Sequence, residues 1–309
     1  MIVAVWNITW QTLADATALG AIYALMAIGI GLVFGVLRLV NFAYGQLIMA
    51  GAYALALTSD LNPALSILVC FAVVIALTMT LDVVAFRPLR RASASPATML
   101  VATFAISFLL QSIATLKLGV LGKTVGTLTG LNHPIGSGTL IVRWIWIVAI
   151  VVAAVTLALL LLLLNRTSLG LHMRAASADF RTARLLGVRA NAVISLAVLL
   201  SGVIAAIVAV VMTVETSYVT ADYALRDTII VLVGVVVGGI DRLWSATLGG
   251  FAIGFAKGLL DGFLPSVGAW PFTSGVYLDS AVFGLVIVVL LVRPDGVFVR
   301  PSKSAVERA

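Results

Sequence analysis

The sequence predicts an all-α protein built from membrane-spanning helices. Of its 309 residues, 62% are hydrophobic and only 10% are charged, and the mean hydropathy is +1.20. Soluble domains are about 45–50% apolar and about 25% charged. The apolar residues also form long continuous runs, whereas the strands of a membrane β-barrel alternate polar and apolar residues. These observations exclude a soluble domain and a barrel, and they predict a polytopic helical membrane protein.

The apolar runs predict eight to nine transmembrane spans. A bilayer core of about 30 Å needs about 20 apolar residues per helix. Candidate spans lie at residues 12–35, 41–58, 64–86, 97–118, 141–164, 191–213, 226–240, 245–264 and 279–293. The second and seventh are short or interrupted by glycine, so eight full spans plus re-entrant pieces is an equal alternative. No polar stretch is long enough to bury a soluble core, so we expect residues 1–309 to form one transmembrane domain.

The basic residues orient these spans. Loops on the cytoplasmic side of a membrane carry an excess of Lys and Arg. If the N-terminus is outside, fourteen of the 19 basic residues fall inside, and five lie outside or within spans. Those five are Lys117, Lys123, Arg143, Arg226 and Lys257. We therefore expect a multi-pass protein of a bacterial inner membrane, with its N-terminus outside and its C-terminus in the cytoplasm. The net charge of +7 reflects this topology and gives no reason to expect nucleic-acid binding.

The longest polar stretch lies between two apolar runs, at residues 165–190. It reads NRTSLGLHMRAASADFRTARLLGVRA and is too polar to span a bilayer. We expect a short helix over residues 175–187, ended by Gly187, to lie on the cytoplasmic face and to dock a soluble, energy-supplying partner. The residues expected on this docking surface are Arg174, Ala175, Ala176, Ala178, Asp179, Arg181, Arg184 and Gly187. Taken alone, the stretch is also consistent with a solvated basic connector.

Glycine spacing is the clearest packing signal in the sequence. Gly250, Gly254, Gly258 and Gly262 recur every four residues and share one helix face, and Gly234 and Gly238 do the same on the preceding span. Small residues let helix backbones approach closely in a membrane. We expect these glycines to pack helices, while a stripe that also lines or gates a pathway is the alternative.

Polar side chains near the start of the second span form the first candidate path. Asn41, Tyr44 and Gln46 are neutral hydrogen-bonding groups, which suit a polar, uncharged or zwitterionic solute. Unpartnered polar groups are costly in lipid, so these should face other helices or a cavity. Hydrogen bonding between helices, without contact to a solute, is the alternative.

Ionisable side chains in the spans form the second candidate. Lys257 and Asp261 are four residues apart on one helix face. An ionisable residue within a span is a functional-site hypothesis by default, although Lys257 could also form a structural pair or extend to the interface. Asp82, Asp227 and Asp261 are the carboxylates nearest to the spans, and each lies near a predicted end.

The sequence offers no catalytic or cofactor site. Gly122-Lys123-Thr124 resembles the end of a phosphate-binding loop, but position 117 holds lysine where that motif needs glycine. His133 and His172 are isolated, Cys70 is the only cysteine, and no nucleophile–base pair is evident. We therefore expect no enzyme activity, no metal and no cofactor on this chain, with any ATP hydrolysed by another subunit.

Five segments in order resemble the LivH-type permeases, the membrane subunits of branched-chain amino acid ABC importers. They are Ala21–Leu55, Phe86–Gln111, Gly170–Gly202, Val235–Gly254 and Val292–Phe298, the last reading VRPDGVF. The resemblance covers nearly the whole chain. It implies two cytoplasmic ATPase subunits, a second, LivM-like permease and an extracytoplasmic solute-binding protein as partners. It also implies that residues 175–187 carry the helix that couples to an ATPase.

Departures from the family pattern leave the solute open. NFAYGQ at residues 41–46 stands where the family has NFAHGD-like residues, so a histidine and a carboxylate are missing. Lys257 is more similar to the urea and short-amide permeases. The expected function is therefore the gated solute path of an ATP-driven importer for branched-chain or other amino acids. A urea or short-amide permease is the first alternative, and a self-sufficient secondary transporter or channel is the second.

Overall fold

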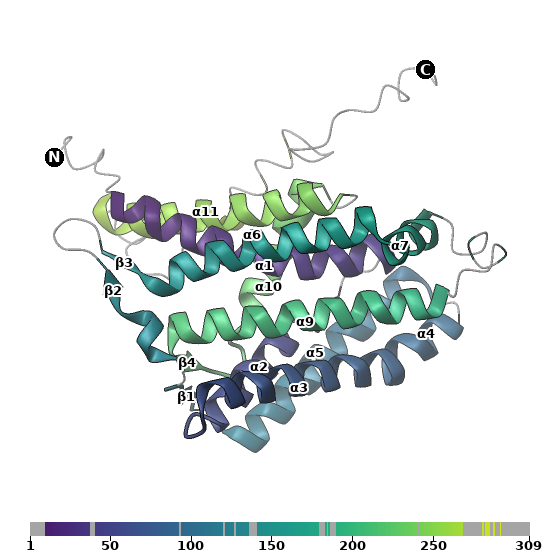
Figure 1. The fold of residues 1–309 in the computed structure, drawn as a ribbon, viewed down its shortest axis with the longest axis horizontal. Coiled ribbons are helices and arrows are strands. Elements are labelled where there is room, and N and C mark those ends of the chain that lie inside the picture. The colour runs from purple at the N-terminus through teal and green to yellow at the C-terminus, as the bar shows by residue number, and fades with distance from the viewer. Residues whose placement is uncertain are drawn as a thin grey trace.

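The chain folds into a bundle of long helices, as the sequence predicts (Figure 1). The computed structural model describes residues 10–37, 41–92, 94–119, 121–126, 128–135, 141–178, 183, 185, 190–239, 242–267, 280, 282–284, 287 and 291. Its helices are α1 (Trp10–Leu37), α2 (Tyr44–Leu57), α3 (Pro63–Leu81), a π-helix (Asp82–Phe86), α4 (Arg87–Arg91), α5 (Pro96–Leu118), α6 (Trp144–Arg166), α7 (Ser168–Ala178), α9 (Ala190–Thr216), α10 (Leu225–Gly238) and α11 (Leu243–Val267). A short 3₁₀ helix covers Thr129–Asn132.

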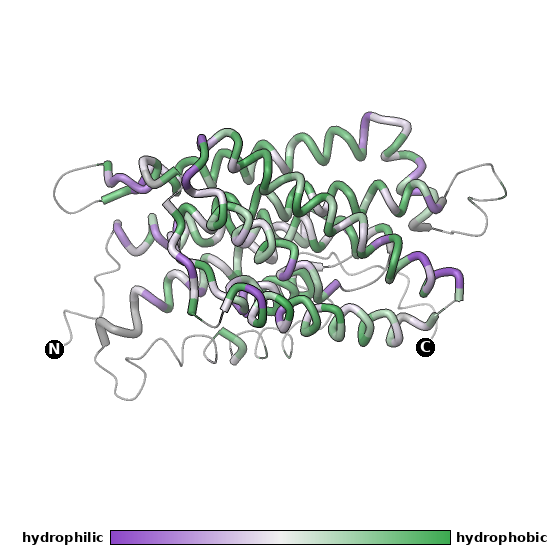
Figure 2. The backbone as a smooth tube through the Cα atoms, turned by 90° about the horizontal axis from the view of Figure 1, so that it is seen from below, coloured by the Kyte–Doolittle hydropathy of each residue, from purple (hydrophilic) through white to green (hydrophobic). Residues whose placement is uncertain are grey.

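Four two-residue strands form two antiparallel pairs at one end of the bundle (Figure 1). β1 (Lys123–Thr124) pairs with β4 (Tyr218–Val219), and β2 (Pro134–Ile135) pairs with β3 (Val142–Arg143). We call this end the strand end. The opposite end, where α4 and α7 lie, is the α7 end. Figure 2 shows hydrophobic residues along the long helices and hydrophilic residues mostly toward these two ends, which is the distribution that a bilayer requires.

Six helical stretches in the described part of the chain are long and apolar enough to cross a membrane. They are Trp10–Val36, Pro63–Arg91, Ala97–Leu118, Trp144–Arg166, Asn191–Thr216 and Leu243–Gly262. All six coincide with predicted spans. The third prediction, 64–86, ends too early, because the π-helix and α4 continue this helix to Arg91. The fifth, 141–164, begins too early, because Val142 and Arg143 form β3. The predicted ninth span, 279–293, lies largely outside the described residues.

The second and seventh predicted spans are short helices, as the re-entrant alternative requires. α2 and α10 have 14 residues each, so each is about 21 Å long and cannot cross a core of about 30 Å. Their first turns meet: a side chain at Gly45 would come within 2.5 Å of Thr228 Oγ1 and 2.8 Å of the Ala224 carbonyl oxygen. From this junction α2 runs to the strand end and α10 runs toward the α7 end (Figure 1).

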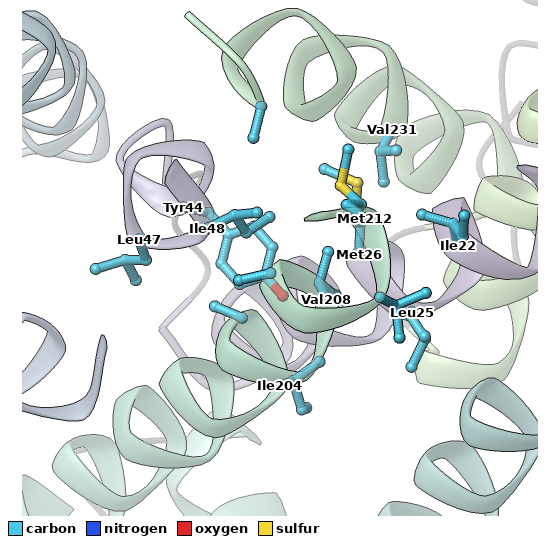
Figure 3. Packing of buried hydrophobic residues seen from close by; sticks show 14 of the residues in the cluster. Ile22, Leu25, Met26, Tyr44, Leu47, Ile48, Ile204, Val208, Met212 and Val231 are labelled. Carbon is cyan, nitrogen blue, oxygen red and sulfur yellow. The ribbon is translucent and has the colours of Figure 1, made fainter. Parts of the chain in front are cut away.

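α1 is the central helix of the bundle. It packs against α6, α9, α10 and α11, and 78% of its most apolar window is buried, against 22% for the span of α5 and 17% for α6. Its apolar core includes Ile22, Leu25 and Met26 of α1, which gather with residues of α2, α9 and α10 (Figure 3). α5 and α6 thus leave most of their apolar surface for lipid or for another chain.

The glycine stripe of α11 packs against α1, which confirms the packing interpretation. Side chains at Gly250, Gly254, Gly258 and Gly262 would overlap Ala27, Tyr23, Ala16 and Thr12 in turn. Gly234 and Gly238 of α10 contact the backbone of α11 in the same way. Because the contacted positions on α1 descend in number as those on α11 rise, the two helices run antiparallel, in close contact along their length.

Candidate functional site

A charged cluster lies where α1, α10 and α11 meet. The Lys257 ammonium donates hydrogen bonds to Tyr23 Oη at 2.8 Å and to Asp227 Oδ1 at 2.9 Å. The Tyr23 hydroxyl donates to the same carboxylate oxygen at 2.5 Å. The Lys257 and Asp227 side chains are 14% and 22% exposed. We call Tyr23, Asp227 and Lys257 the central cluster.

Local sequence explains why these three groups meet. Lys257 lies between Gly254 and Gly258, and this glycine face brings α11 against Tyr23 and Ala16 of α1. Asp227 is in the first turn of α10, where the helix dipole favours a negative charge. Tyr23 lies near the middle of the 28-residue α1. The ion pair is therefore held at about half the depth of the bundle, where unpaired charges are most costly.

A polar cavity adjoins the central cluster on the strand-end side. Its volume is about 470 Å³, and Asp227 belongs to both the cluster and the cavity wall. The remaining lining residues are Met212, Thr216, Tyr218, Thr220, Asp222, Tyr223 and Arg226. The cavity thus presents carboxylates, hydroxyls and a guanidinium within one space, a donor and acceptor set that can bind both ends of a zwitterion.

Tyr223 contributes a neutral hydroxyl to this cavity. Burial raises the pKa of the Tyr223 hydroxyl well above its ordinary value, so it stays protonated at neutral pH. Its oxygen lies 3.1 Å from Thr216 Oγ1. Tyr223 therefore gives the cavity an uncharged hydrogen-bonding group at neutral pH.

The structure pairs Lys257 with a different carboxylate from the one four residues away. Asp227, 30 residues earlier in the chain, forms the ion pair, while Asp261 is exposed one turn farther along α11. The sequence identified Lys257 as a candidate and named Asp227 as a nearby carboxylate. It gave no signal that Tyr23 would join them, since tyrosine is common in apolar helices.

Asn41, just before α2, and Tyr44 and Gln46, in its first turn, are buried. Asn41 Oδ1 accepts a hydrogen bond from the Ala43 N–H at 3.0 Å, and Gln46 Nε2 donates to Ser107 Oγ on α5 at 3.3 Å. The Tyr44 ring packs over Gly29 of α1, near Ile48 (Figure 3). Tyr44 Oη and Gln46 Oε1 have no hydrogen-bond partner among the described residues. Asn41 thus uses its side-chain oxygen within its own turn, while Tyr44 and Gln46 keep unused polar atoms inside the bundle.

A second charged cluster lies at the α7 end, and sequence reasoning did not predict it. Asp82, the first residue of the π-helix, accepts hydrogen bonds from Arg87 Nε and Arg90 Nη2, both at 2.9 Å. Ser195 of α9 donates to the same carboxylate at 2.6 Å. We call Asp82, Arg87, Arg90 and Ser195 the end cluster. It ties the long α3–α4 helix to the start of α9.

The predicted docking residues lie partly in α7. This helix begins at Ser168, seven residues before the predicted start at Ala175, and packs on α6 and α9. Arg174 is exposed and donates to Asn165 Oδ1 at 3.0 Å, Ala175 is half-buried and Ala176 is buried. Ala178 is the last residue of α7. Asp179, Arg181, Arg184 and Gly187 lie outside the described residues, as does most of the predicted helix over 175–187.

Comparison with known families gives one match over most of the chain. Residues 12–291 match the family described as "Branched-chain amino acid transport system / permease component". The permease protein BraD of a high-affinity branched-chain amino acid transport system from Pseudomonas aeruginosa is 30% identical, over 94% of this chain and 96% of that protein. The corresponding LivH proteins of Salmonella typhimurium and Escherichia coli K12 are 28% and 27% identical over the same shares.

Solved structures share the fold at low sequence identity. PsaBC from Streptococcus pneumoniae, in complex with Fab, aligns with a TM-score of 0.52 and 14% identity over 96% of this chain and 97% of that one. An inward-facing transporter described as of the metal-chelate ABC type aligns with a TM-score of 0.51 and 16% identity, over 93% and 89%. At these identities the likeness concerns the fold alone.

Proposed function

Because the chain belongs to the permease family of branched-chain amino acid transport systems, we propose that it forms the solute path of an ATP-driven importer for amino acids. The observation that supports this function best is the central cluster. A lysine–carboxylate pair inside a membrane bundle, beside a polar cavity of about 470 Å³, is expensive to maintain and marks a path for a polar solute.

The chain works with partners that its family implies. Permeases of ABC transporters act with ATPase and solute-binding proteins, and this chain is expected to hydrolyse no ATP itself. We infer two ATPase subunits, a second LivM-like permease and an extracytoplasmic solute-binding protein. The largely exposed apolar surfaces of α5 and α6 leave room for a second permease chain.

The charge distribution supports an orientation. Arg87, Arg90, Arg91, Arg166, Arg174 and Arg242 lie at or beside helix ends at the α7 end. The positive-inside rule therefore puts the α7 end in the cytoplasm, with the N-terminus outside. The strand end then receives the solute from the binding protein, and the cavity beside Asp227 is the first space that the solute reaches.

We place ATPase coupling in residues 165–190 of this single transmembrane domain. The exposed Arg174 gives α7 a basic surface, and α7 contacts both α1 and α9. An ATPase that moves α7 would therefore act on the central helix and on a wall of the bundle. Access changes because the two states make different contacts with the partners, without a chemical step on this chain.

Reconstituted uptake tests the function. The tagged chain is purified with the subunits that accompany it, placed in liposomes with its binding protein, and assayed for leucine, urea and acetamide uptake with and without ATP. We expect ATP-dependent amino acid uptake. Preference for urea or acetamide would support the short-amide alternative, and uptake without ATP or partners would show a secondary transporter.

Variants test the path within the same assay. We expect Asp227→Asn and Lys257→Met to reduce uptake at least about tenfold, because each leaves a polar or charged group unmatched beside the cavity. Asp261→Asn is the matched control on α11, since this exposed carboxylate is outside the cluster. Full uptake by both cluster variants would show that the central cluster is not part of the solute path. It would not contradict the assignment as an ATP-driven importer.

A further inference from the structure

A groove lies at the α7 end, over the last turns of α1. Its volume is about 320 Å³, at the lower end of the range of about 300–1,000 Å³ for small-molecule sites. α6, α7 and the start of α11 supply the walls. This groove is separate from the central cluster and from the cavity beside Asp227.

The floor of the groove is made of glycine. Gly31 and Gly35 of α1 are one turn apart, and a side chain built at Gly35 would meet nothing within 4 Å. Leu161, Leu164 and Leu243 form apolar walls. The missing side chain at Gly35 thus leaves a channel with an apolar lining that a hydrocarbon chain can fill.

Two arginines stand at the same groove. Arg174 of α7 and Arg242, just before α11, both line it, and no described acidic side chain does. The guanidinium of Arg242 forms no hydrogen bond or ion pair with the described part of the chain, and Asn165 adds an amide beside Arg174. Two arginines that line one space favour an anionic group there, and arginine matches phosphate geometry particularly well.

The position of the groove matches the headgroup level of a bilayer. It is bounded by the last residues of α1 and α6 and the first residues of α11, where the spans end. Trp244, which is exposed, lies at its edge, and tryptophan is enriched at membrane interfaces. A ligand in this groove has its polar part at the interface and its apolar part among the helices.

We propose that this groove is a binding site for an anionic phospholipid, with the phosphate between Arg174 and Arg242 and an acyl chain over Gly35. Basic pockets between transmembrane helices bind such headgroups by charge and shape. The phosphate of the lipid accepts hydrogen bonds from guanidinium groups at this groove, and its acyl chain fills the space over Gly35. It also joins α7 to α1, α6 and α11 through one bound molecule.

Native mass spectrometry of the purified chain tests this proposal. Phosphatidylglycerol and phosphatidylcholine with identical acyl chains are added to wild type and to the double variant Arg174→Gln/Arg242→Gln. We expect wild type to retain phosphatidylglycerol preferentially. In the double variant, the ratio of retained phosphatidylglycerol to phosphatidylcholine should fall about tenfold. Arg166→Gln is the matched control, since Arg166 is exposed at the same end and does not line the groove. Equal retention of both lipids by wild type, or an equal loss in the control, overturns the proposal.

A second pair of variants tests the acyl part. Gly35→Leu fills the channel, whereas Gly35→Ala adds one methyl group and leaves it open, and neither meets a neighbour at Cβ. We expect Gly35→Leu to lose phosphatidylglycerol and Gly35→Ala to keep it, with both eluting as wild type on size exclusion. Equal retention by the two variants contradicts an acyl chain at this place.

Two further measurements distinguish a bound lipid from other ligands of the groove. Inorganic phosphate and glycerophosphoglycerol carry the anionic group without acyl chains, and we expect neither to raise thermal stability as the full lipid does. Equal stabilisation would identify a soluble anion site instead. If the arginine variants lose copurifying ATPase but retain phosphatidylglycerol, the groove is an ATPase contact and the lipid proposal is wrong.

Discussion

The end cluster and the central cluster hold their carboxylates in different ways. Asp82 is fully buried and accepts hydrogen bonds from two arginines and a serine. Asp227 meets one lysine and one tyrosine, is 22% exposed, and forms part of a cavity wall. The first carboxylate is closed off by donors within the protein, whereas the second keeps a face toward a space that a solute can enter.

This difference indicates how one kind of interaction serves two purposes. A closed, multiply hydrogen-bonded cluster fixes the relative position of helices, because removing its carboxylate leaves a buried charge without its partner. An open pair beside a cavity can exchange a protein contact for a solute contact at little cost. The four predictions below test that contrast, beginning with the largest expected effect on stability.

Replacing Asp82 should destabilise the protein most. Asp82→Ala leaves Arg90, whose side chain is only 12% exposed, without its counter-charge, so we expect a loss of about 3–5 kcal/mol. Asp227→Ala should cost clearly less, because water in the adjoining cavity can solvate Lys257. Thermal unfolding in detergent measures both, with Asp60→Ala as an exposed control. Equal losses of stability in Asp82→Ala and Asp227→Ala would contradict the proposed difference between the two clusters.

Widening the contact between α1 and α11 should disturb the central cluster alone. In Gly254→Leu the new Cβ would lie 2.7 Å from Tyr23 Cβ and 2.9 Å from Gly20 Cα, so the helices must separate. Overpacking of this kind costs about 1–3 kcal/mol. Stability and uptake are measured together, and Ala252→Leu on the exposed face of α11 is the control. If both variants behave alike, close packing does not position Lys257.

Removing one hydroxyl from each cluster makes a matched pair. Tyr23→Phe and Ser195→Ala each delete a hydrogen bond to a carboxylate, and each should cost about 1 kcal/mol. Uptake should differ: we expect it to fall in Tyr23→Phe, which changes the donors around Asp227, and to stay near wild type in Ser195→Ala. The reverse pattern would show that the solute path lies beside the end cluster and not beside the central cluster.

Gln46→Leu should have the smallest effect on stability. The lost hydrogen bond to Ser107 is offset by removal of an amide oxygen that has no partner, so we expect a change within about 0.5 kcal/mol. Uptake should still fall if Gln46 contributes to the path. Gln111→Leu on α5, whose side-chain oxygen also has no partner, is the comparison. Equal uptake by wild type and Gln46→Leu would remove this residue from the path.

Much of the fold was predictable because the bilayer imposes a length and a composition on each span. The six long spans and the packing role of Gly250, Gly254, Gly258 and Gly262 follow from local periodicity and length, whereas the contact with α1 does not. The π-helix at Asp82–Phe86 was not predicted, because its wider turn depends on how Asp82 meets Arg87, Arg90 and Ser195 in three dimensions.

The candidate site was only half predictable. Lys257 is conspicuous as a charge in an apolar run, but its partner could be named only by proximity in sequence, which pointed to Asp261. The observed pairing with Asp227 depends on the antiparallel packing of α10 and α11, and the contribution of Tyr23 depends on the crossing of α1. One sequence records helix faces but does not record which faces meet.

The contact at Gly45 has a mechanical consequence. There is no space for even a methyl group between the beginning of α2 and the Ala224–Thr228 turn of α10. A movement of either short helix at this contact must therefore move the other. The two helices extend from the contact toward opposite sides of the membrane. Replacing Gly45 with alanine would therefore force the two short helices apart.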